Sequence, residues 1–269
     1  MPAEKAFLGL DPKDAVTYED ARAVIIPFGL ENSVTYGGGT AQGPAAIIRA
    51  SHEVELFDEH LWCEPFRQLG IVTLEEPSIE NEIPKALQQL EKIVKQVLDD
   101  QKFPFVLGGE HSITIGAIRP FLKKYDNLIL LHFDAHADLR NGYHGEHYSH
   151  ASAIRRCLDQ ANLKVVSVGI RNISAEEIPF VEENRERIRI YWGKDKKKWD
   201  IDEIVSHLKD LPIYLTFDVD GFDSSVMPAT GTPEPGGLFW QDVIEIITAA
   251  SQVGTIVGAD INELAPIPY

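Results

Sequence analysis

Histidines gather in one part of this sequence: six of its nine histidines lie between residues 111 and 150. Aspartates are interleaved with them in HFDAHAD (132–138), and an acidic pair closes the later segment TFDVD (216–220). Carboxylate oxygens and imidazole nitrogens without a thiolate suit Mn²⁺ better than zinc or copper. The cluster therefore predicts a metal site, although a lone Asp-Xaa-Asp after a strand is often only turn chemistry.

The spacing within each acidic segment lets alternate side chains project together, because successive side chains of an extended chain point to opposite faces. The candidate metal ligands are His111, Asp134, His136, Asp138, Asp218 and Asp220. Four carboxylates and two imidazoles are too many for one tetrahedral zinc and fit two ions that share bridging carboxylates. We expect two Mn²⁺ per chain. His132 could also face the site by its even spacing, but within LLHFD it is interpreted as a buried core histidine.

Two metal ions of this kind can supply a nucleophile, since a pair about 3.5 to 4 Å apart lowers the pKa of a shared water from about 15.7 towards about 7. The sequence has no GxSxG motif and no cysteine with a plausible histidine partner, so covalent acyl chemistry has no support. YGGGTAQGP (36–44) lacks the Lys-Ser/Thr pair of a phosphate-binding loop. Metal-assisted hydrolysis is the reaction class that these observations favour.

The elements that must position these residues follow an alternating pattern. Short β-branched runs bounded by glycine alternate with amphipathic segments, which is typical of a parallel sheet flanked by helices. Eight strands are expected, at residues 23–29, 69–74, 104–109, 128–134, 165–171, 187–193, 212–218 and 255–261. Apolar residues at 83, 87, 90, 94 and 97 indicate one face of a helix. Further helices are expected after Ser174, which has capping-box spacing to Glu177, and at 200–208 and 241–250.

The chemistry-bearing residues come directly after predicted strands. In a sheet of this class, ligands bind beyond the carboxyl ends of the strands. Four expected strands run into His111, into the segment that starts at Asp134, into Asp218 and Asp220, and into Glu263. This coincidence favours one metal site over separate polar loops. No internal repeat or linker interrupts the pattern, so residues 1–269 are expected to form a single domain.

The composition is that of an acidic protein with ample material for a core, at 44% apolar residues and a net charge of −17. The charge disfavours nucleic acid and anionic membranes as partners and favours a small cationic substrate. No apolar run is long enough to span a bilayer and the N-terminus lacks an apolar signal core, so a cytoplasmic location is expected. Cys63 and Cys157 match no paired motif, which favours two free thiols over a disulfide.

Several segments together resemble the ureohydrolase family, which includes arginase, agmatinase and formiminoglutamase. They are YGGGTAQGPAAIIR (36–49), GGEH (108–111), FDAHAD (133–138), FDVDGFD (217–223), MPATGTPEPGGL (227–238) and GADINELAP (258–266). The match extends from about residue 23 to the end, in the family's order. The resemblance implies a three-layer α/β/α fold around an eight-stranded parallel sheet and a binuclear manganese centre that hydrolyses a guanidino group to urea or an equivalent.

The resemblance also implies how the ligands divide between the ions. One manganese is expected to be held by His111, Asp134, Asp138 and Asp218. The other is expected to be held by Asp134, His136, Asp218 and Asp220, so that Asp134 and Asp218 bridge. Asp138 is expected to orient the attacking hydroxide.

Three further positions match residues that handle the substrate in this family. Glu263 is expected to pair with guanidinium nitrogens, and Thr232 to add a hydrogen bond. His150 is expected to carry a proton to the leaving amine, because YSHASAIRR resembles the agmatinase pattern directly before a helix. His144 and His147 are expected to lie at the surface.

The choice of substrate depends on the loop LRNGYHGEHYSH (139–150), which resembles agmatinases more than the Asn/Ser-rich segment of arginases. Glu146 and the acidity of the chain fit a substrate whose far end is an amine. Agmatine, giving putrescine and urea as in polyamine biosynthesis, is therefore favoured. Arginine, guanidinobutyrate and formiminoglutamate are the alternatives, and Arg140 would favour a carboxylate tail if it faced the pocket.

The sequence departs from the family in two places. Ser224 stands where the family usually has proline, and the chain stops at Tyr269, where members continue into a final helix. A homo-oligomer, the trimer or hexamer of the family, is an expectation. Two other hypotheses stay open: a two-metal phosphoesterase, disfavoured because no Asn-His dipeptide occurs, and a metal-binding homologue without turnover.

Overall fold

The computed structural model describes residues 1–267, which contain one sheet of eight parallel strands. The strands are β1 (Ala23–Phe28), β2 (Ile71–Thr73), β3 (Phe103–Gly108), β4 (Ile129–Phe133), β5 (Lys164–Val168), β6 (Ile188–Tyr191), β7 (Pro212–Asp218) and β8 (Thr255–Asn262). Their order across the sheet is β2-β1-β3-β8-β7-β4-β5-β6. All eight predicted strands are confirmed, with small shifts at their ends.

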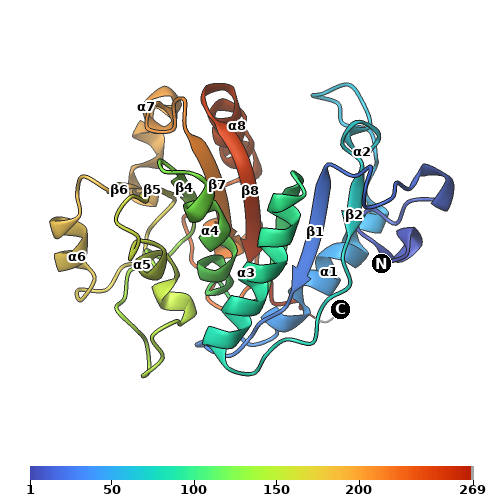
Figure 1. Ribbon diagram of the computed structural model, residues 1–269. Coiled ribbons are helices and arrows are strands. Elements are labelled where there is room, and N and C mark those ends of the chain that lie inside the picture. The colour runs from blue at the N-terminus through green and yellow to red at the C-terminus, as the bar shows by residue number, and fades with distance from the viewer. Residues whose placement is uncertain (268–269) are drawn as a thin grey trace.

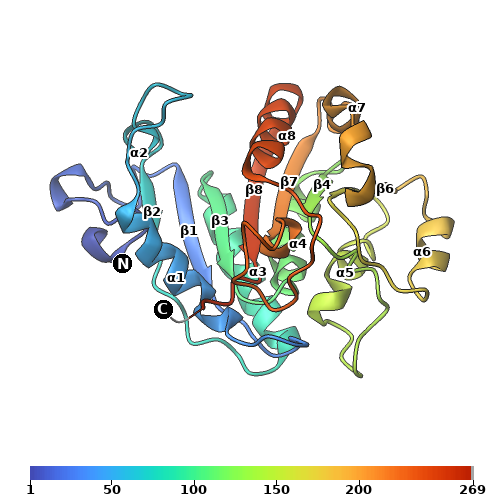
Figure 2. The ribbon, with the colours of Figure 1, turned by 180° about the vertical axis from the view of Figure 1, so that it is seen from behind.

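Helices cover both faces of the sheet (Figures 1 and 2). They are α1 (Gly43–Ala50), α2 (Pro65–Leu69), α3 (Ile83–Asp99), α4 (Ile113–Lys124), α5 (Ala153–Cys157), α6 (Ile178–Glu183), α7 (Ile201–Ser206) and α8 (Trp240–Val253). Figure 1 shows α3, α4 and α5 in front of the sheet, whereas α1 and α8 lie in front of it in Figure 2. The predicted three-layer α/β/α fold is confirmed.

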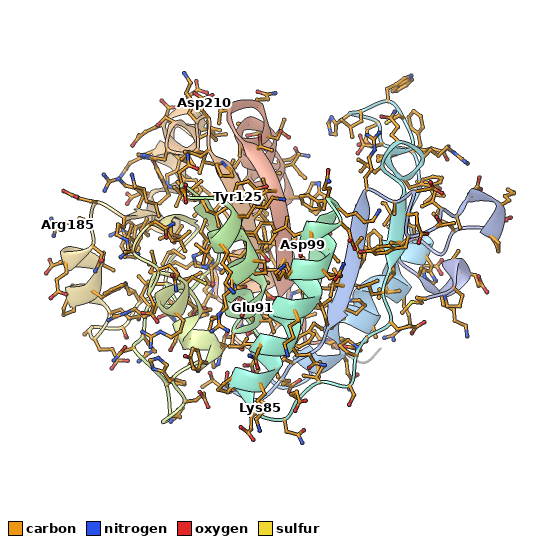
Figure 3. The ribbon with its side chains drawn as sticks, viewed as in Figure 1. Lys85, Glu91, Asp99, Tyr125, Arg185 and Asp210 are labelled. Atoms are coloured by element: carbon orange, nitrogen blue, oxygen red, sulfur yellow. The ribbon has the colours of Figure 1, made fainter. Side chains whose placement is uncertain are left out.

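The face of α3 predicted from its apolar spacing is the face that packs. Its members are Ile83, Leu87, Leu90, Val94 and Val97, all of which are buried in one cluster with β1, β3 and α4. Burial of an apolar side chain of this size contributes roughly 1.5 to 3 kcal/mol, so the stripe holds the helix on the sheet. Of the α3 residues labelled in Figure 3, Lys85 and Asp99 are exposed, whereas Glu91 pairs with Arg119 and Lys123 of α4.

The central strands β4 and β7 are mostly apolar and buried on both faces. Every residue of β4 from Ile129 to Phe133 is buried, and Phe133 stacks on Phe217 of β7 with ring centroids 5.2 Å apart. A second apolar cluster joins these strands to α7 and α8. Continuous apolar runs are expected of strands covered on both faces, and they explain why most of the ligand residues stand at the strand ends.

One helix begins later than predicted. The segment after Ser174 first forms a turn, and α6 begins only at Ile178. The Glu177 carboxylate accepts hydrogen bonds from the Ser174 backbone N–H at 2.6 Å and from its hydroxyl at 2.7 Å, so half of the predicted capping box forms. The second oxygen of Glu177 accepts from the Leu139 N–H at 2.8 Å. This turn therefore supports the segment that carries Asp138.

The predicted helices at 200–208 and 241–250 are confirmed as α7 and α8. Cys63 and Cys157 are free thiols, as predicted. Within residues 1–267, no helix combines the length and the apolar character that a membrane crossing requires. That the chain forms a single domain stays a prediction.

Candidate functional site

Four neighbouring strands deliver the predicted site residues to one edge of the sheet. β3, β8, β7 and β4 are consecutive neighbours. His111 follows β3, Asp134 follows β4, Asp218 closes β7, and Glu263 follows β8. Because parallel strands end at the same edge, residues more than 150 positions apart along the chain meet there: the Glu263 carboxylate accepts from the His111 N–H at 2.7 Å across a separation of 152 residues.

Two glycines allow the chain to approach closely at the end of β3. A Cβ on Gly108 would lie 2.0 Å from Asn262 Oδ1, and one on Gly109 would lie 2.1 Å from the carbonyl oxygen of Leu30. Both distances are shorter than real Cβ contacts, so larger residues would displace the chain. The two glycines of GGEH therefore let the chain that carries His111 pack closely against its neighbours at the end of β3.

His111 points one ring nitrogen at three carboxylates. Its Nδ1 lies 3.1 Å from Asp134 Oδ2, 3.1 Å from Asp138 Oδ2 and 3.4 Å from Asp218 Oδ2. The ring is buried, and Nδ1 makes no hydrogen bond within the described residues. A buried polar nitrogen without a hydrogen-bond partner calls for an explanation, and a bound ion would supply one.

The other ring nitrogen of His111 is held by a buried polar network. Its Nε2 lies 2.9 Å from Thr216 Oγ1, and the Thr216 hydroxyl donates to Asp260 Oδ1 at 2.6 Å. Since the hydroxyl has only one proton and gives it to the carboxylate, His111 Nε2 must be the donor to Thr216. Nε2 thus keeps its proton, and Nδ1 is the ring nitrogen that can offer its lone pair to a cation in place of a proton.

A second group of ligand atoms lies on the other side of Asp134. His136 Nδ1 is 3.0 Å from Asp220 Oδ2 and 3.6 Å from Asp134 Oδ1. The possible ligand atoms of Asp134, His136 and Asp220 all lie within 4.8 Å of one another. Asp134 thus contacts both halves of the cluster, as expected of a bridging carboxylate.

His132 was predicted to be a buried core residue, and it is fully buried. It also contacts the site, because its Nε2 lies 2.8 Å from Asp134 Oδ2 while its Nδ1 lies 3.0 Å from Ser167 Oγ. The sequence analysis preferred the core interpretation, but the even spacing of His132 from Asp134 in an extended segment also allowed this contact.

Backbone strain accompanies two of the site residues. Asp138 has φ 54° and Glu263 has φ 65°, both in the left-handed region that residues other than glycine seldom adopt. Strain of this kind persists where the surroundings enforce it, often at functional sites. Here it turns both carboxyl groups to the pocket, which they line together.

Burial and mutual repulsion raise the pKa of most carboxyl groups in the cluster. Burial, followed by the negative charges of Asp220 and Asp134, raises the pKa of Asp218 well above its usual value. Burial and the negative charge of Asp134 raise the pKa of Asp138 to about 6. Burial also raises the pKa of Glu263 well above its usual value. The raised pKa values indicate that the carboxylates of the cluster outweigh the positive charge around them.

The imidazoles supply what positive charge the cluster has. Burial alone would lower the pKa of His136, but hydrogen bonds to Asp134 and Asp220 raise it to about 12. Burial would raise the pKa of Asp134, yet the neighbouring imidazoles of His111, His132 and His136 hold that pKa well below its usual value. Divalent cations at this place would supply the same charge more effectively. The donor set, with its free Nδ1 and buried carboxylates, therefore fits divalent metal ions.

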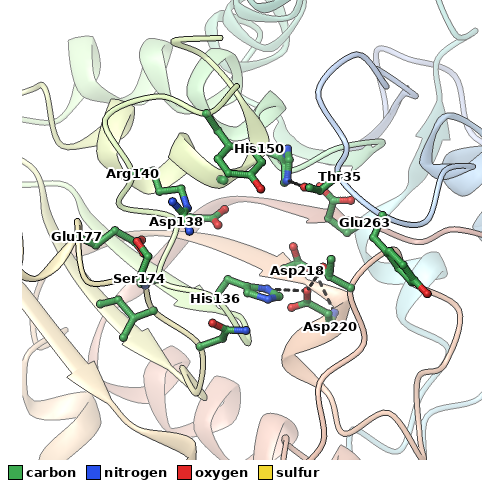
Figure 4. Close-up of a pocket in the computed structure, with 17 residues that line it drawn as sticks. Thr35, His136, Asp138, Arg140, His150, Ser174, Glu177, Asp218, Asp220 and Glu263 are labelled. Carbon is green, nitrogen blue, oxygen red and sulfur yellow. Dashed lines mark hydrogen bonds and ion pairs between the residues drawn. The ribbon is translucent and has the colours of Figure 1, made fainter. Parts of the chain in front are cut away.

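A cavity of about 210 Å³ opens over these ligands. Figure 4 shows His136, Asp138, Asp218 and Asp220 around it, with Glu263 at one side. Thr232 also lines it and donates from its hydroxyl to Asp220 Oδ2 at 3.1 Å. The predicted ligands other than His111 and Asp134, and all predicted substrate residues, line this one cavity.

The loop after Asp138 supplies the far wall of the cavity. His150, Tyr143 and Arg140 line it, and Arg140 also pairs with Glu176. Burial, with the positive charges of His111 and His136, lowers the pKa of His150 to about 4. His144 and His147 are exposed.

The similarity of this chain to known proteins agrees with this geometry. The model of the arginase family matches residues 21–268. The chain is 33% identical to an N(1)-aminopropylagmatine ureohydrolase of Synechocystis sp., over 96% of this chain and 86% of the relative, and 32% identical to an agmatinase of Bacillus cereus, over 98% and 89%. The crystal structure of an agmatine ureohydrolase of Thermoplasma volcanium superimposes with a TM-score of 0.84 at 32% identity, over 97% of this chain and 86% of that one. This chain therefore belongs to the arginase family, the membership that its motifs predicted.

Proposed function

We propose that this protein is a binuclear manganese hydrolase that releases urea from a small guanidino substrate, most favourably agmatine. The observation that carries the proposal is the convergence of four carboxylates and two imidazoles at the floor of one cavity. The proposed ligands of one ion are His111, Asp134, Asp138 and Asp218. Those of the other are Asp134, His136, Asp218 and Asp220.

The bound ions would supply a water of lowered pKa and positive charge for the tetrahedral intermediate. The chain's own residues then position the substrate. Glu263 presents a carboxylate to guanidinium nitrogens, for which a planar two-point contact is suited. Thr232 adds a hydrogen bond, Asp138 orients the attacking oxygen, and His150 carries the proton that the leaving amine needs.

The substrate's tail would lie along the loop of residues 139–150. The relatives named above are an agmatinase and ureohydrolases of agmatine and of N(1)-aminopropylagmatine, which supports a tail that ends in an amine. We propose agmatine, with putrescine and urea as the products. The acidity of the chain, with a net charge of −17, also favours a cationic substrate.

A guanidino acid such as guanidinobutyrate is the second candidate, and one observation favours it: Arg140 lines the cavity. A free guanidinium there would attract a carboxylate tail. Arg140 is not free, because it pairs with Glu176 and lies over the ring of Tyr143 at 5.0 Å from its centroid. Agmatine therefore stays first.

The test is urea release from Mn²⁺-loaded protein with agmatine, N(1)-aminopropylagmatine, arginine, guanidinobutyrate and guanidinopropionate, together with formamide release from formiminoglutamate. We expect the highest kcat/KM with agmatine or its aminopropyl derivative. A higher value for guanidinobutyrate would make Arg140 the residue that selects the tail. If none of these compounds is turned over, the proposed activity is refuted and the hypothesis of a metal-binding homologue without turnover is favoured.

A cytoplasmic homo-oligomer, a trimer or hexamer, completes the proposal. The oligomeric state rests on the family alone, and light scattering of the purified protein checks it.

A further inference from the structure

His150 is hydrogen-bonded to a loop that is distant in sequence. Both of its ring nitrogens face hydroxyls of the segment after β1: Nδ1 lies 3.2 Å from Ser33 Oγ, and Nε2 lies 2.6 Å from Thr35 Oγ1. The His150 backbone N–H also donates to Ser33 Oγ, at 2.9 Å. Neither ring nitrogen is therefore directed freely into the cavity.

The loop that carries these hydroxyls is itself held firmly. The carboxylate of Glu110 accepts from the backbone N–H groups of Asn32 and Ser33, both at 2.6 Å. Glu31 closes the other end of the loop by accepting from the Gly39 N–H at 2.9 Å and the Ala41 N–H at 2.7 Å. Thr35 therefore meets His150 in a defined position.

Counting protons assigns the direction of each bond. The Ser33 hydroxyl gives its one proton to Glu110 Oε1, at 2.8 Å. It can then only accept from His150, so Nδ1 carries a proton in the neutral ring. Nε2 is left as the acceptor, and the Thr35 hydroxyl donates to it. Protonation of His150 reverses this last bond, with Nε2–H donating to Thr35.

We propose that the Thr35 hydroxyl is the group through which His150 exchanges its proton with the substrate's leaving nitrogen. The inference rests on the proposed function and adds Thr35 to the residues that act in it. As the C–N bond breaks, its electron pair goes to nitrogen, which takes the Thr35 hydroxyl proton. Thr35 takes the Nε2 proton of His150 at the same time. The proton that the attacking water gives up first protonates the neutral ring of His150 at Nε2, and its passage through Thr35 to the leaving nitrogen returns His150 to the neutral form.

The position of Thr35 suits this role. It is exposed to solvent, yet it lines the same cavity as Asp138, Glu263 and His150. Figure 4 shows the contact of His150 with Thr35 on one wall of that cavity, with the carboxylates of Asp218 and Asp220 elsewhere around it. A hydroxyl that both donates and accepts can pass a proton without moving its oxygen.

The test compares Thr35→Val, which keeps the shape and removes the hydroxyl, with Thr35→Ser, which keeps the hydroxyl. We expect Thr35→Val to lower kcat at least about tenfold with KM within about twofold, because positioned proton transfer contributes about 10² to 10⁴ in rate. Thr35→Ser should stay within about threefold of the wild type. Thr255→Val, a surface threonine at the opposite end of β8, is the matched control.

A double-mutant comparison separates a relay from a purely structural role. If Thr35 acts through His150, adding Thr35→Val to His150→Asn lowers kcat no further. A wild-type kcat in Thr35→Val, or an equal loss in both backgrounds, would overturn the inference.

A spectroscopic readout distinguishes this inference from the function on which it rests. In ¹⁵N-histidine NMR, with His150→Asn to assign the ring, we expect a protonated Nδ1 and an Nε2 resonance that shifts in Thr35→Val. An unprotonated Nδ1, or an unchanged Nε2, would refute the contact even if the protein releases no urea. Failure of the proposed function would instead appear as wild-type protein inactive on every substrate.

Discussion

At the scale of single residues, Asp134 is the group on which both halves of the cluster depend. Its Oδ2 lies 3.1 Å from His111 Nδ1 and 2.8 Å from His132 Nε2, while its Oδ1 accepts from the His136 backbone N–H at 2.6 Å. The imidazole of His136 lies farther off, with Nδ1 3.6 Å from Oδ1. It is the side chain that two neighbouring cations would share.

Asp134→Asn removes the shared charge and should abolish stoichiometric binding of two Mn²⁺. Metal content per chain after gel filtration, measured by mass spectrometry, checks this. Asp99→Asn, at the exposed end of α3 (Figure 3), is the control and should retain both ions. Two ions and full activity in Asp134→Asn would show that the site has been misplaced.

Binding of the metal should also depend on pH. The pKa of Asp138 is raised to about 6 by burial and by Asp134, and burial with the charges of Asp220 and Asp134 also raises that of Asp218 well above its usual value. Protons held by these groups must leave when a cation binds, so affinity should fall as pH falls through about 6 and below. Calorimetry in buffers of different ionisation enthalpy measures the protons released. An Mn²⁺ affinity that does not change between about pH 5 and about pH 8 would contradict these shifts.

At the scale of elements, the end of β3 shows how tightly the ligand-bearing segments meet. Gly109 approaches the backbone of Leu30, and the Glu263 N–H donates to the Gly109 carbonyl at 2.7 Å. One glycine thus joins the ends of β1, β3 and β8. The position of His111, two residues later, depends on that approach.

Gly109→Ala should destabilise the protein by about 2 kcal/mol or more, because its Cβ would meet the Leu30 backbone and the strand ends must move. It should also weaken Mn²⁺ binding. Gly145→Ala is the matched control: nothing lies within 4 Å of its Cβ, so only its φ of +85° matters, at a cost of about 1 kcal/mol. Urea unfolding measures both. Equal effects in the two variants would argue against the close approach.

The elements themselves were largely predictable, since strands such as β4 are apolar on both faces and their ends are marked by polar residues. The start of α6 was predicted wrongly because the Glu177 carboxylate serves the Leu139 N–H as well as Ser174. Long-range contacts of this type leave no local pattern. The approach of Thr35 to His150, 115 residues away, was beyond sequence reasoning for the same reason.

At the scale of the whole molecule, the net charge of −17 should attract a cationic substrate before it reaches the cavity. An acidic protein attracts a dication over a distance set by the Debye length, which is about 30 Å at 0.01 M salt and about 8 Å at 0.15 M. Association with a cationic guanidino amine should therefore weaken as salt is added.

Raising the ionic strength from about 0.01 M to about 0.3 M should lower kcat/KM for agmatine several-fold. Guanidinobutyrate, whose charges sum to zero, is the control and should change little. Steady-state rates of urea release measure both. An equal response of the two substrates would show that the overall charge has no part in substrate capture.

The central claim is that a pair of metal ions in this cavity hydrolyses a guanidino group. The most direct test is the rate of urea release from agmatine by metal-free protein as Mn²⁺ is added in known equivalents per chain. The account predicts a rate that rises until two equivalents are bound and then stays constant. A plateau at one equivalent, or no urea at any ratio, would contradict it.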